Sequence, residues 1–207
     1  MLFKNREVAA ILLSKKLQQY KNSDTVVLAV PRGGVPIGNV LASELNLPLD
    51  FILAKKIGHP INSEYAIGCV TMDDVFISNH SNGTTEYYQN ESKKIKKDLK
   101  EKYKNFMNGR QPVSINEKNV IITDDGIATG ETLKACIESV RKKNPKKIIL
   151  AVPVAPKSTA NLFRNIADEF ICLFEPKNFR GVGQFYSDFS QVNDFEVKEI
   201  LSNQFHS

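Results

Sequence analysis

Short apolar runs alternate with amphipathic helical patterns along most of this chain, and this alternation limits the folds that it can adopt. Runs rich in Val, Ile and Leu, each bounded by turn residues, predict strands at 26–30, 49–54, 120–123, 148–152 and 169–173. Apolar residues at helical spacing predict helices at 35–45, 131–142 and 157–166. Strands that alternate with helices are normally parallel, so the sequence predicts an α/β fold: an open, mainly parallel sheet flanked by helices on both faces.

Two segments depart from this alternation. Residues 84–107 form one long helical pattern with Ile95, Leu99 and Tyr103 at four-residue spacing, which predicts an inserted helix at about 84–108. Its other positions are rich in lysine: Lys93, Lys94, Lys96, Lys97, Lys100 and Lys104. Such lysines can contact RNA or DNA, but a solvated lysine face around an apolar stripe is the commoner arrangement. Residues 6–20 predict a further helix that packs outside the sheet.

The overall composition is that of a globular protein. The 207 residues are 42% hydrophobic and 25% charged, so we expect residues 1–207 to form a single domain with a full core. No run approaches the roughly 20 apolar residues that cross a bilayer, and the chain is already charged at Lys4 and Arg6, which predicts a soluble, cytoplasmic protein without a membrane partner. The net charge of +5 suits a polyanion or a phosphate-rich small substrate.

The three cysteines, Cys69, Cys136 and Cys172, are widely spaced and lie in apolar segments. A zinc site needs closely spaced ligands, and the sequence contains no Cys-x-x-Cys pair. We therefore expect three reduced thiols in the core.

The chemistry is concentrated in residues 120–132. An apolar strand ends in Asp124 and Asp125, and a short loop containing Gly126 and Gly130 leads into a helix. In an open α/β sheet, ligands bind at the carboxyl ends of the strands, where this loop must lie. The glycines allow backbone N–H groups to turn toward a ligand, and the start of the following helix is partially positive. The pattern predicts a phosphate-binding loop.

The side chains of this loop indicate which phosphate it binds. Thr129 and Thr132 offer hydroxyl groups to phosphate oxygens, while the two aspartates suit the vicinal hydroxyls of a sugar, so the segment predicts a ribose 5-phosphate site. It lacks the Gly-Lys-Ser/Thr of a nucleotide P-loop, and residues 33–38 do not fit the dinucleotide pattern. A surface turn at Asp-Asp-Gly, followed by a glycine at a helix start, is the simpler alternative.

Residues 120–132 resemble the binding motif for phosphoribosyl pyrophosphate (PRPP) of type I phosphoribosyltransferases, and nearly the whole chain resembles a poorly characterised bacterial branch of that family. The resemblance implies that Asp124 and Asp125 bind the ribose and position Mg²⁺. It implies that the loop binds the 5-phosphate through Gly126, Ala128, Thr129, Gly130, Glu131 and Thr132. Asp188 resembles a metal-positioning acid of the oxopurine enzymes, although it lies one residue further from Val182-Gly183 here.

Residues 30–36 occupy the place of the family's pyrophosphate loop, so Arg32, Gly33 and Gly34 are implied to bind the leaving group. Lys55 or Lys56 is implied to supply a second cation, because residues 55–58 and 62–68 occupy the place of the flexible catalytic loop. The implied catalytic set is Asp124, Asp125, Arg32 and Lys56. The C-terminal segment, about 176–207, is implied to form a small hood over the acceptor with Phe179, Phe185 and Tyr186.

The implied function is Mg²⁺-dependent transfer of ribose 5-phosphate from PRPP to a nitrogenous acceptor, with release of pyrophosphate, in nucleotide metabolism. The sequence does not identify the acceptor. Ala128 stands where the oxopurine enzymes carry an acid in this loop, so we expect hypoxanthine and guanine to be poor acceptors. A non-catalytic PRPP-binding regulator of RNA or DNA is the alternative, favoured by the lysine-rich helix, and a homodimer is compatible with either function.

Overall fold

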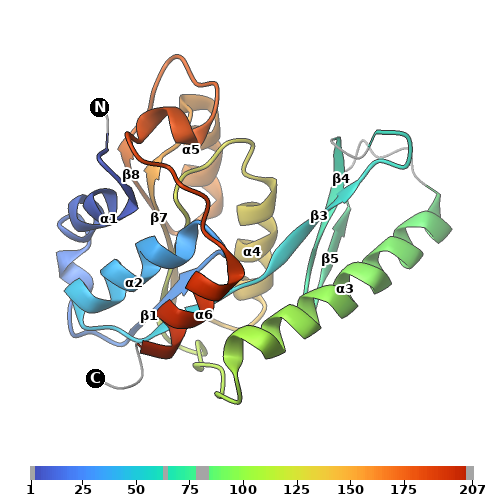
Figure 1. Ribbon diagram of the computed structural model, residues 1–207, viewed down its shortest axis with the longest axis horizontal. Helices are drawn as coiled ribbons and strands as arrows, with labels where there is room; N and C mark the ends of the chain where they lie inside the picture. The colour runs from blue at the N-terminus through green and yellow to red at the C-terminus, as the bar shows by residue number, and fades with distance from the viewer. Residues whose placement is uncertain (1–2, 63–64, 78–83, 204–207) are drawn as a thin grey trace.

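The computed structural model describes residues 3–62, 65–77 and 84–203. A parallel sheet of five strands forms the centre, in the order β2 (Leu49–Phe51), β1 (Thr25–Ala29), β6 (Asn119–Thr123), β7 (Lys147–Val154) and β8 (Glu169–Phe174). The register aligns Ala29 with both Phe51 and Thr123, and Thr123 with Ala151. The carboxyl ends of the central strands therefore meet at one edge, which confirms the predicted α/β architecture (Figure 1).

Helices cover both faces of this sheet, because alternate residues of each strand point to opposite sides. Val27, Ile121 and Ile149 share a core with α1 (Arg6–Ser14) and α2 (Gly34–Leu45). Their neighbours Val26, Val120 and Ile148 share a second core with α4 (Glu131–Arg141) and α5 (Lys157–Ile166). The continuous apolar runs of the sequence thus correspond to strands that are buried on both faces.

A second, antiparallel sheet was not predicted. Its strands are β3 (Ala54–Gly58), β4 (Ala66–Thr71) and β5 (Val75–Ile77), and together with α3 (Thr85–Met107) they form the lobe at the right of Figure 1. The single strand predicted at 49–54 is wrong, since β2 ends at Phe51 and β3 begins at Ala54 in the other sheet. An apolar run does not reveal where a chain changes its pairing partner.

The segment compared with a flexible loop is largely regular. Residues 55–58 and 66–68 lie in β3 and β4, while Ser63 and Glu64 of that segment lie outside the described residues. The long helix α3 agrees with the expected boundaries, because the Thr84 side chain accepts a hydrogen bond from the Tyr87 N–H at its start and Asn108 is left-handed at its end.

The C-terminal segment packs against earlier elements of the chain. A short 3₁₀ helix (Val182–Phe185) precedes α6 (Asp194–Asn203), which contacts α2 and α3 and was not predicted. Residues 204–207 of the expected hood lie outside the described residues. Within the described ranges, none of the helices is both long enough and apolar enough to cross a bilayer.

Candidate functional site

The phosphate loop predicted from the sequence connects the end of β6 to the start of α4. Gly130 occupies the position before the helix with φ +82°, and a Cβ there would lie 2.6 Å from the Phe163 ring, so backbone conformation and space both require glycine. Thr129 and Glu131 are exposed beside it. In the described part of the chain, no side chain caps the first turn of α4, which leaves a partially positive helix start suited to an anion.

Asp124 and Asp125 follow β6 and are half-buried at the carboxyl edge of the sheet. One carboxylate oxygen of Asp124 accepts the Asp125 N–H at 2.8 Å. Burial, with the neighbouring Asp125 charge, raises the pKa of Asp124 well above its usual range. Burial also raises the pKa of Asp125, although Arg6 opposes that change. A bound cation or hydroxyl donor would favour the ionised forms.

The glycines of the predicted pyrophosphate loop allow it to contact the phosphate loop. A Cβ on Gly33 would lie 2.0 Å from Oδ2 of Asp125, and one on Gly34 would lie 2.7 Å from the Thr123 carbonyl oxygen. The two loops predicted to bind opposite ends of one ligand therefore meet at Asp125. Arg32 is exposed, and its guanidinium lies 3.7 Å from the Asp194 carboxylate of α6.

The two candidate lysines of β3 have different partners. The Lys56 ammonium lies 3.4 Å from the Thr129 hydroxyl, which brings it to the phosphate loop. The Lys55 ammonium instead lies 3.3 Å from the Asp98 carboxylate on α3. Successive residues of a strand point to opposite sides, so only one of the pair can face the loop.

The predicted hood aromatics belong largely to the core. Phe185 and Tyr186 are buried, and the half-buried Phe179 stacks on Phe185 with ring centroids 5.6 Å apart. Tyr186 also reaches the site, because its hydroxyl donates to the Asp125 carbonyl oxygen at 2.6 Å. Asp188 is exposed, and within the described residues it has no hydrogen bond or ion pair with Asp124 or Asp125.

Arg6 is a site residue that the sequence analysis missed. Its Nε and Nη2 lie 2.9 and 2.8 Å from Oδ2 of Asp125, which is 119 positions further along the chain. A lone arginine at the start of an amphipathic helix gives no signal of such a contact. Only the packing of α1 against α2, β7 and β8 brings it to the site.

The donors fit a magnesium ion only in part. Mg²⁺ is typically held by one or two carboxylates, with substrate phosphates and water completing its octahedron, and Asp124 and Asp125 supply such carboxylates. Across the described ranges, no group of three or more His, Cys, Asp or Glu side chains could hold a metal. A magnesium ion at this edge would therefore need ligands from the substrate.

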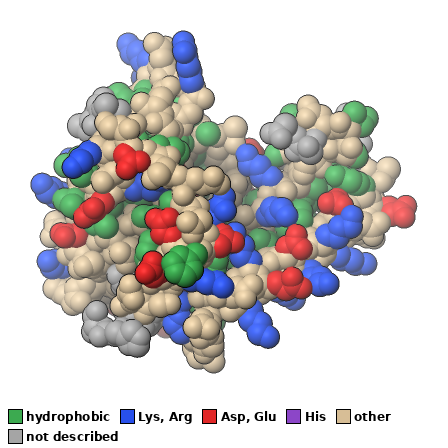
Figure 2. Space-filling model, in the orientation of Figure 1, with side chains coloured by type: hydrophobic (Ala, Val, Ile, Leu, Met, Phe, Trp, Pro, Cys, Tyr) green, Lys and Arg blue, Asp and Glu red, His purple; other side chains and the backbone are tan. Residues whose placement is uncertain are grey.

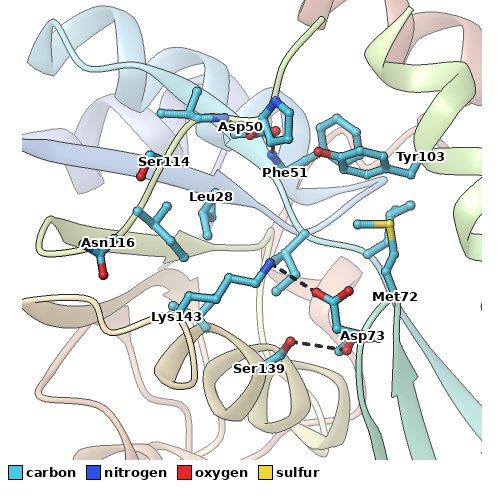
Figure 3. Close-up of a pocket in the computed structure, with 17 residues that line it drawn as sticks. Leu28, Asp50, Phe51, Met72, Asp73, Tyr103, Ser114, Asn116, Ser139 and Lys143 are labelled. Atoms are coloured by element: carbon cyan, nitrogen blue, oxygen red, sulfur yellow. Dashed lines mark hydrogen bonds and ion pairs between the residues drawn. The ribbon is translucent and has the colours of Figure 1, made fainter. Parts of the chain in front are cut away.

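A cavity of about 360 Å³ lies away from the loop, beside the last turns of α4 (Figure 3). Its charged groups already have protein partners. Lys143 pairs with Asp73 at 3.3 Å, and the Asp50 carboxylate accepts the N–H groups of Phe51 and Val113 at 2.8 Å each. The cavity contains none of the predicted site residues, and its paired charges make it a poorer candidate for a phosphate ligand.

The three cysteines are free thiols, as expected from the sequence. Cys69 and Cys136 are buried and Cys172 is half-buried. Burial raises the pKa of Cys69 and of Cys172 to about 11, so both thiols stay protonated at neutral pH.

Comparison with known proteins agrees with this geometry. The profile of the phosphoribosyl transferase domain matches residues 2–190. A Mycobacterium tuberculosis protein named "Putative phosphoribosyl transferase Rv0571c" is 36% identical over 205 residues, which are 97% of this chain and 46% of that protein. The chain thus spans about half the length of the curated relatives that it matches.

Two solved structures are similar along almost their whole length. The protein TT1426 from Thermus thermophilus is 30% identical with a TM-score of 0.86, over 99% of each chain. The purine phosphoribosyltransferase from Pyrococcus horikoshii is 20% identical with a TM-score of 0.52, over 91% of this chain and 92% of its own, which shows a shared fold.

Proposed function

Because the chain belongs to the phosphoribosyl transferase domain family, we propose that it transfers the ribose 5-phosphate of PRPP to a nitrogenous acceptor and releases pyrophosphate. One observation carries the proposal: two half-buried aspartates follow β6, and a short loop leads from them to the start of α4, which no side chain of the described residues caps. The Lys56 ammonium lies 3.4 Å from the Thr129 hydroxyl of that loop. This arrangement combines groups for a sugar diol with groups for a phosphate.

Each part of PRPP has a proposed partner. The backbone N–H groups and hydroxyls of residues 129–132 bind the 5-phosphate, and Asp124 and Asp125 bind the ribose hydroxyls. Arg32, with the backbone at Gly33 and Gly34, binds the pyrophosphate, whose negative charge grows as its bond to the sugar breaks. Lys56 supplies a further cation from β3. Arg32 must turn away from Asp194 to do this, and an exposed pair of that kind is weak.

Magnesium is part of the proposal. Asp124 and Asp125 would hold it together with oxygens of the substrate, and it would neutralise charge on the departing pyrophosphate. The protein's own contribution is to fix the two carboxylates. Backbone hydrogen bonding restrains Asp124, and the ion pair with Arg6 restrains Asp125.

The proposed acceptor is a nitrogen nucleophile other than hypoxanthine or guanine. Ala128 is exposed in the phosphate loop, and its carbonyl oxygen accepts a hydrogen bond from the Thr159 hydroxyl at 3.0 Å. An alanine cannot accept a proton from a purine nitrogen as a carboxylate can. A panel of nucleobases and small amines, assayed for pyrophosphate release from PRPP, would identify the acceptor.

Binding can be tested apart from turnover. Titration calorimetry with PRPP and Mg²⁺ should give a saturable signal that Asp124→Asn/Asp125→Asn abolishes, while Asp24→Asn/Asp98→Asn, which neutralises two exposed acids outside the loop, leaves it unchanged. Equal affinity in the first double variant would refute the assignment. Binding without pyrophosphate release for any acceptor would favour the regulator over the transferase.

A further inference from the structure

We propose that Arg6 is a positioning residue for the ribose site: it fixes the Asp125 carboxylate through Oδ2, so that the sugar meets a carboxylate of defined orientation. This inference rests on the proposed function, because it assigns a ligand to Asp125. It concerns a residue outside the phosphate loop, the pyrophosphate loop and β3.

The contact between the two side chains is directional and shielded from water. Nε and Nη2 of Arg6 both reach Oδ2 of Asp125, at 2.9 and 2.8 Å. Only 11% of the Arg6 side chain and 14% of the Asp125 side chain are exposed. A shielded pair of this kind resists screening by salt, and removing its cation leaves an uncompensated, partly desolvated carboxylate.

Arg6 is itself held on two further sides. Its Nη1 donates to the Ser190 carbonyl oxygen at 2.8 Å, and its guanidinium carbon lies 4.0 Å from the centre of the Phe189 ring. Phe189 stacks on Tyr186 with centroids 5.0 Å apart, and the Tyr186 hydroxyl binds the Asp125 carbonyl oxygen. Both the side chain and the backbone of Asp125 are therefore fixed from outside the loop.

Gly33 shows why the orientation of this carboxylate matters. A Cβ at that position would lie 2.0 Å from Oδ2 and 3.2 Å from Oδ1 of Asp125, so the pyrophosphate loop lies directly against the carboxylate that Arg6 holds. A rotation of Asp125 would disturb the contact between the two loops. The Arg6 charge also offsets the adjacent Asp124 and Asp125 charges, which otherwise repel phosphate oxygens.

A role of Arg6 at the ribose site predicts different effects on the affinity for inorganic phosphate and for ribose 5-phosphate. Inorganic phosphate needs only residues 129–132, whereas ribose 5-phosphate also needs Asp125. Losing the guanidinium should therefore weaken ribose 5-phosphate binding by about tenfold or more, which is the size of effect typical of charged groups in direct contact. The affinity for inorganic phosphate should stay within about twofold of the wild-type value. A general loss of structure would weaken both ligands together.

The test compares Arg6→Gln, Arg6→Lys and Phe189→Leu with wild type, by NMR titration with inorganic phosphate and with ribose 5-phosphate, each with Mg²⁺. Arg6→Gln should lose only ribose 5-phosphate affinity. Arg6→Lys should recover part of it, because it keeps the charge but not the paired donors. Phe189→Leu removes the ring from the guanidinium but keeps the Asp125 contact, so it should weaken ribose 5-phosphate binding less than Arg6→Gln does and leave phosphate affinity within about twofold. Thermal unfolding of each variant records structural damage separately.

The outcomes distinguish the two proposals. If wild type binds ribose 5-phosphate and Arg6→Gln binds it equally well, or loses both ligands in parallel, the role of Arg6 is refuted while the proposed function stands. If wild type binds neither ligand, the proposed function fails and the role of Arg6 fails with it. If Arg6→Gln does not fold, the same two titrations are made with Arg6→Lys. For that variant we expect a smaller selective loss of ribose 5-phosphate affinity.

Discussion

At the scale of single residues, the candidate site includes contacts that the sequence does not reveal. The resemblance implied that Gly33 and Gly34 bind the leaving group, and the structure adds a steric reason for glycine, since neither position has room for a Cβ. The two aspartates and the loop after them could be predicted from the local pattern, whereas Lys55 and Lys56 were implied by the resemblance, and of the two it is Lys56 that lies beside the loop. The contact between Arg6 and Asp125 could not be predicted, because 119 positions separate them and no periodicity links them.

Gly33→Ala tests the contact between the two loops. The new Cβ would lie 2.0 Å from Oδ2 of Asp125, so the carboxylate or the loop must move. We expect PRPP affinity to fall by about tenfold or more, as calorimetry would show, with an unchanged circular dichroism spectrum. Gly181→Ala is the matched control, because that residue is extended and, apart from its chain neighbours, no atom of the described residues lies within 4 Å of its Cβ position. Wild-type affinity in Gly33→Ala would contradict the described contact.

Glu169 gives a prediction on stability and pH. Burial opposes its ionisation, but hydrogen bonds from Lys147 and Tyr20 outweigh burial and hold its pKa below the ordinary 4.5. A lowered pKa stabilises the folded state above the unfolded-state value, and this stabilisation is lost as pH falls through the folded-state value.

Glu169→Gln should therefore lower the free energy of unfolding at pH 7 by about 1 kcal/mol, a small value because the pair is partly solvated. The difference from wild type should shrink below about pH 4.5. Urea unfolding of both proteins at several pH values would measure it. A difference that stays constant down to pH 2 would show that Glu169 acts through packing and not through its charge.

At the scale of elements, α3 shows what helical periodicity reveals and what it leaves open. Its apolar stripe was predicted correctly, since Ile95 and Leu99 are buried. The lysines around it are mixed with acidic partners (Figure 2): Lys94 pairs with Glu91 at 2.7 Å, and Lys102 pairs with Asp194 at 3.2 Å. This mixture favours a solvated face over a nucleic-acid surface.

Replacing four exposed lysines of α3 tests that interpretation. The variant Lys93→Gln/Lys97→Gln/Lys100→Gln/Lys104→Gln should bind PRPP as wild type does, because these residues lie outside the loops. Fluorescence anisotropy at about 150 mM salt should detect no RNA or DNA binding by either protein. Salt-dependent binding by wild type that the variant loses would support the nucleic-acid regulator instead.

The unpredicted elements have physical explanations. The edge strand β3 carries the exposed Lys55 and Lys56, and β5 is only three residues long, so neither shows a clear apolar alternation. The helix α6 buries only Val197 and Leu201, too few positions to define a period. Tertiary contacts determine the structure of β3, β5 and α6, and they override the weak local preference of these segments for strand or helix.

At the scale of the whole molecule, the start of the described chain packs against residues 185–190 beside the site. The Phe3 N–H donates to the Phe185 carbonyl oxygen, and the Ser187 N–H donates to the Phe3 carbonyl oxygen, each at 2.7 Å. The Phe3 ring is 1% exposed and lies 5.4 Å from that of Tyr186. The residues that hold Asp125 from outside the loop are therefore anchored by residues near the start of the chain.

Phe3→Ala tests this anchoring. Removing a buried ring leaves a cavity, so we expect a loss of about 3 kcal/mol in the free energy of unfolding, measured by urea titration. We also expect weaker PRPP binding, because Tyr186 loses its support. Phe195→Ala is the control, since 73% of that residue is exposed. Unchanged stability in Phe3→Ala would show that Phe3 contributes little to holding residues 185–187 in place.

The contacts of residues 186–190 with Arg6 and Asp125 form only after those residues have been synthesised. The ribosome adds the phosphate loop before residue 133, yet Tyr186, Phe189 and Ser190 arrive more than 50 residues later. Until then Arg6, made near the beginning, has no carbonyl to bind at position 190 and no ring to stack on at position 189. A chain made only as far as residue 185 thus carries every predicted phosphate ligand but lacks the residues that hold Arg6 and Asp125, so we expect the proposed sugar site to form only after residue 190 has been added.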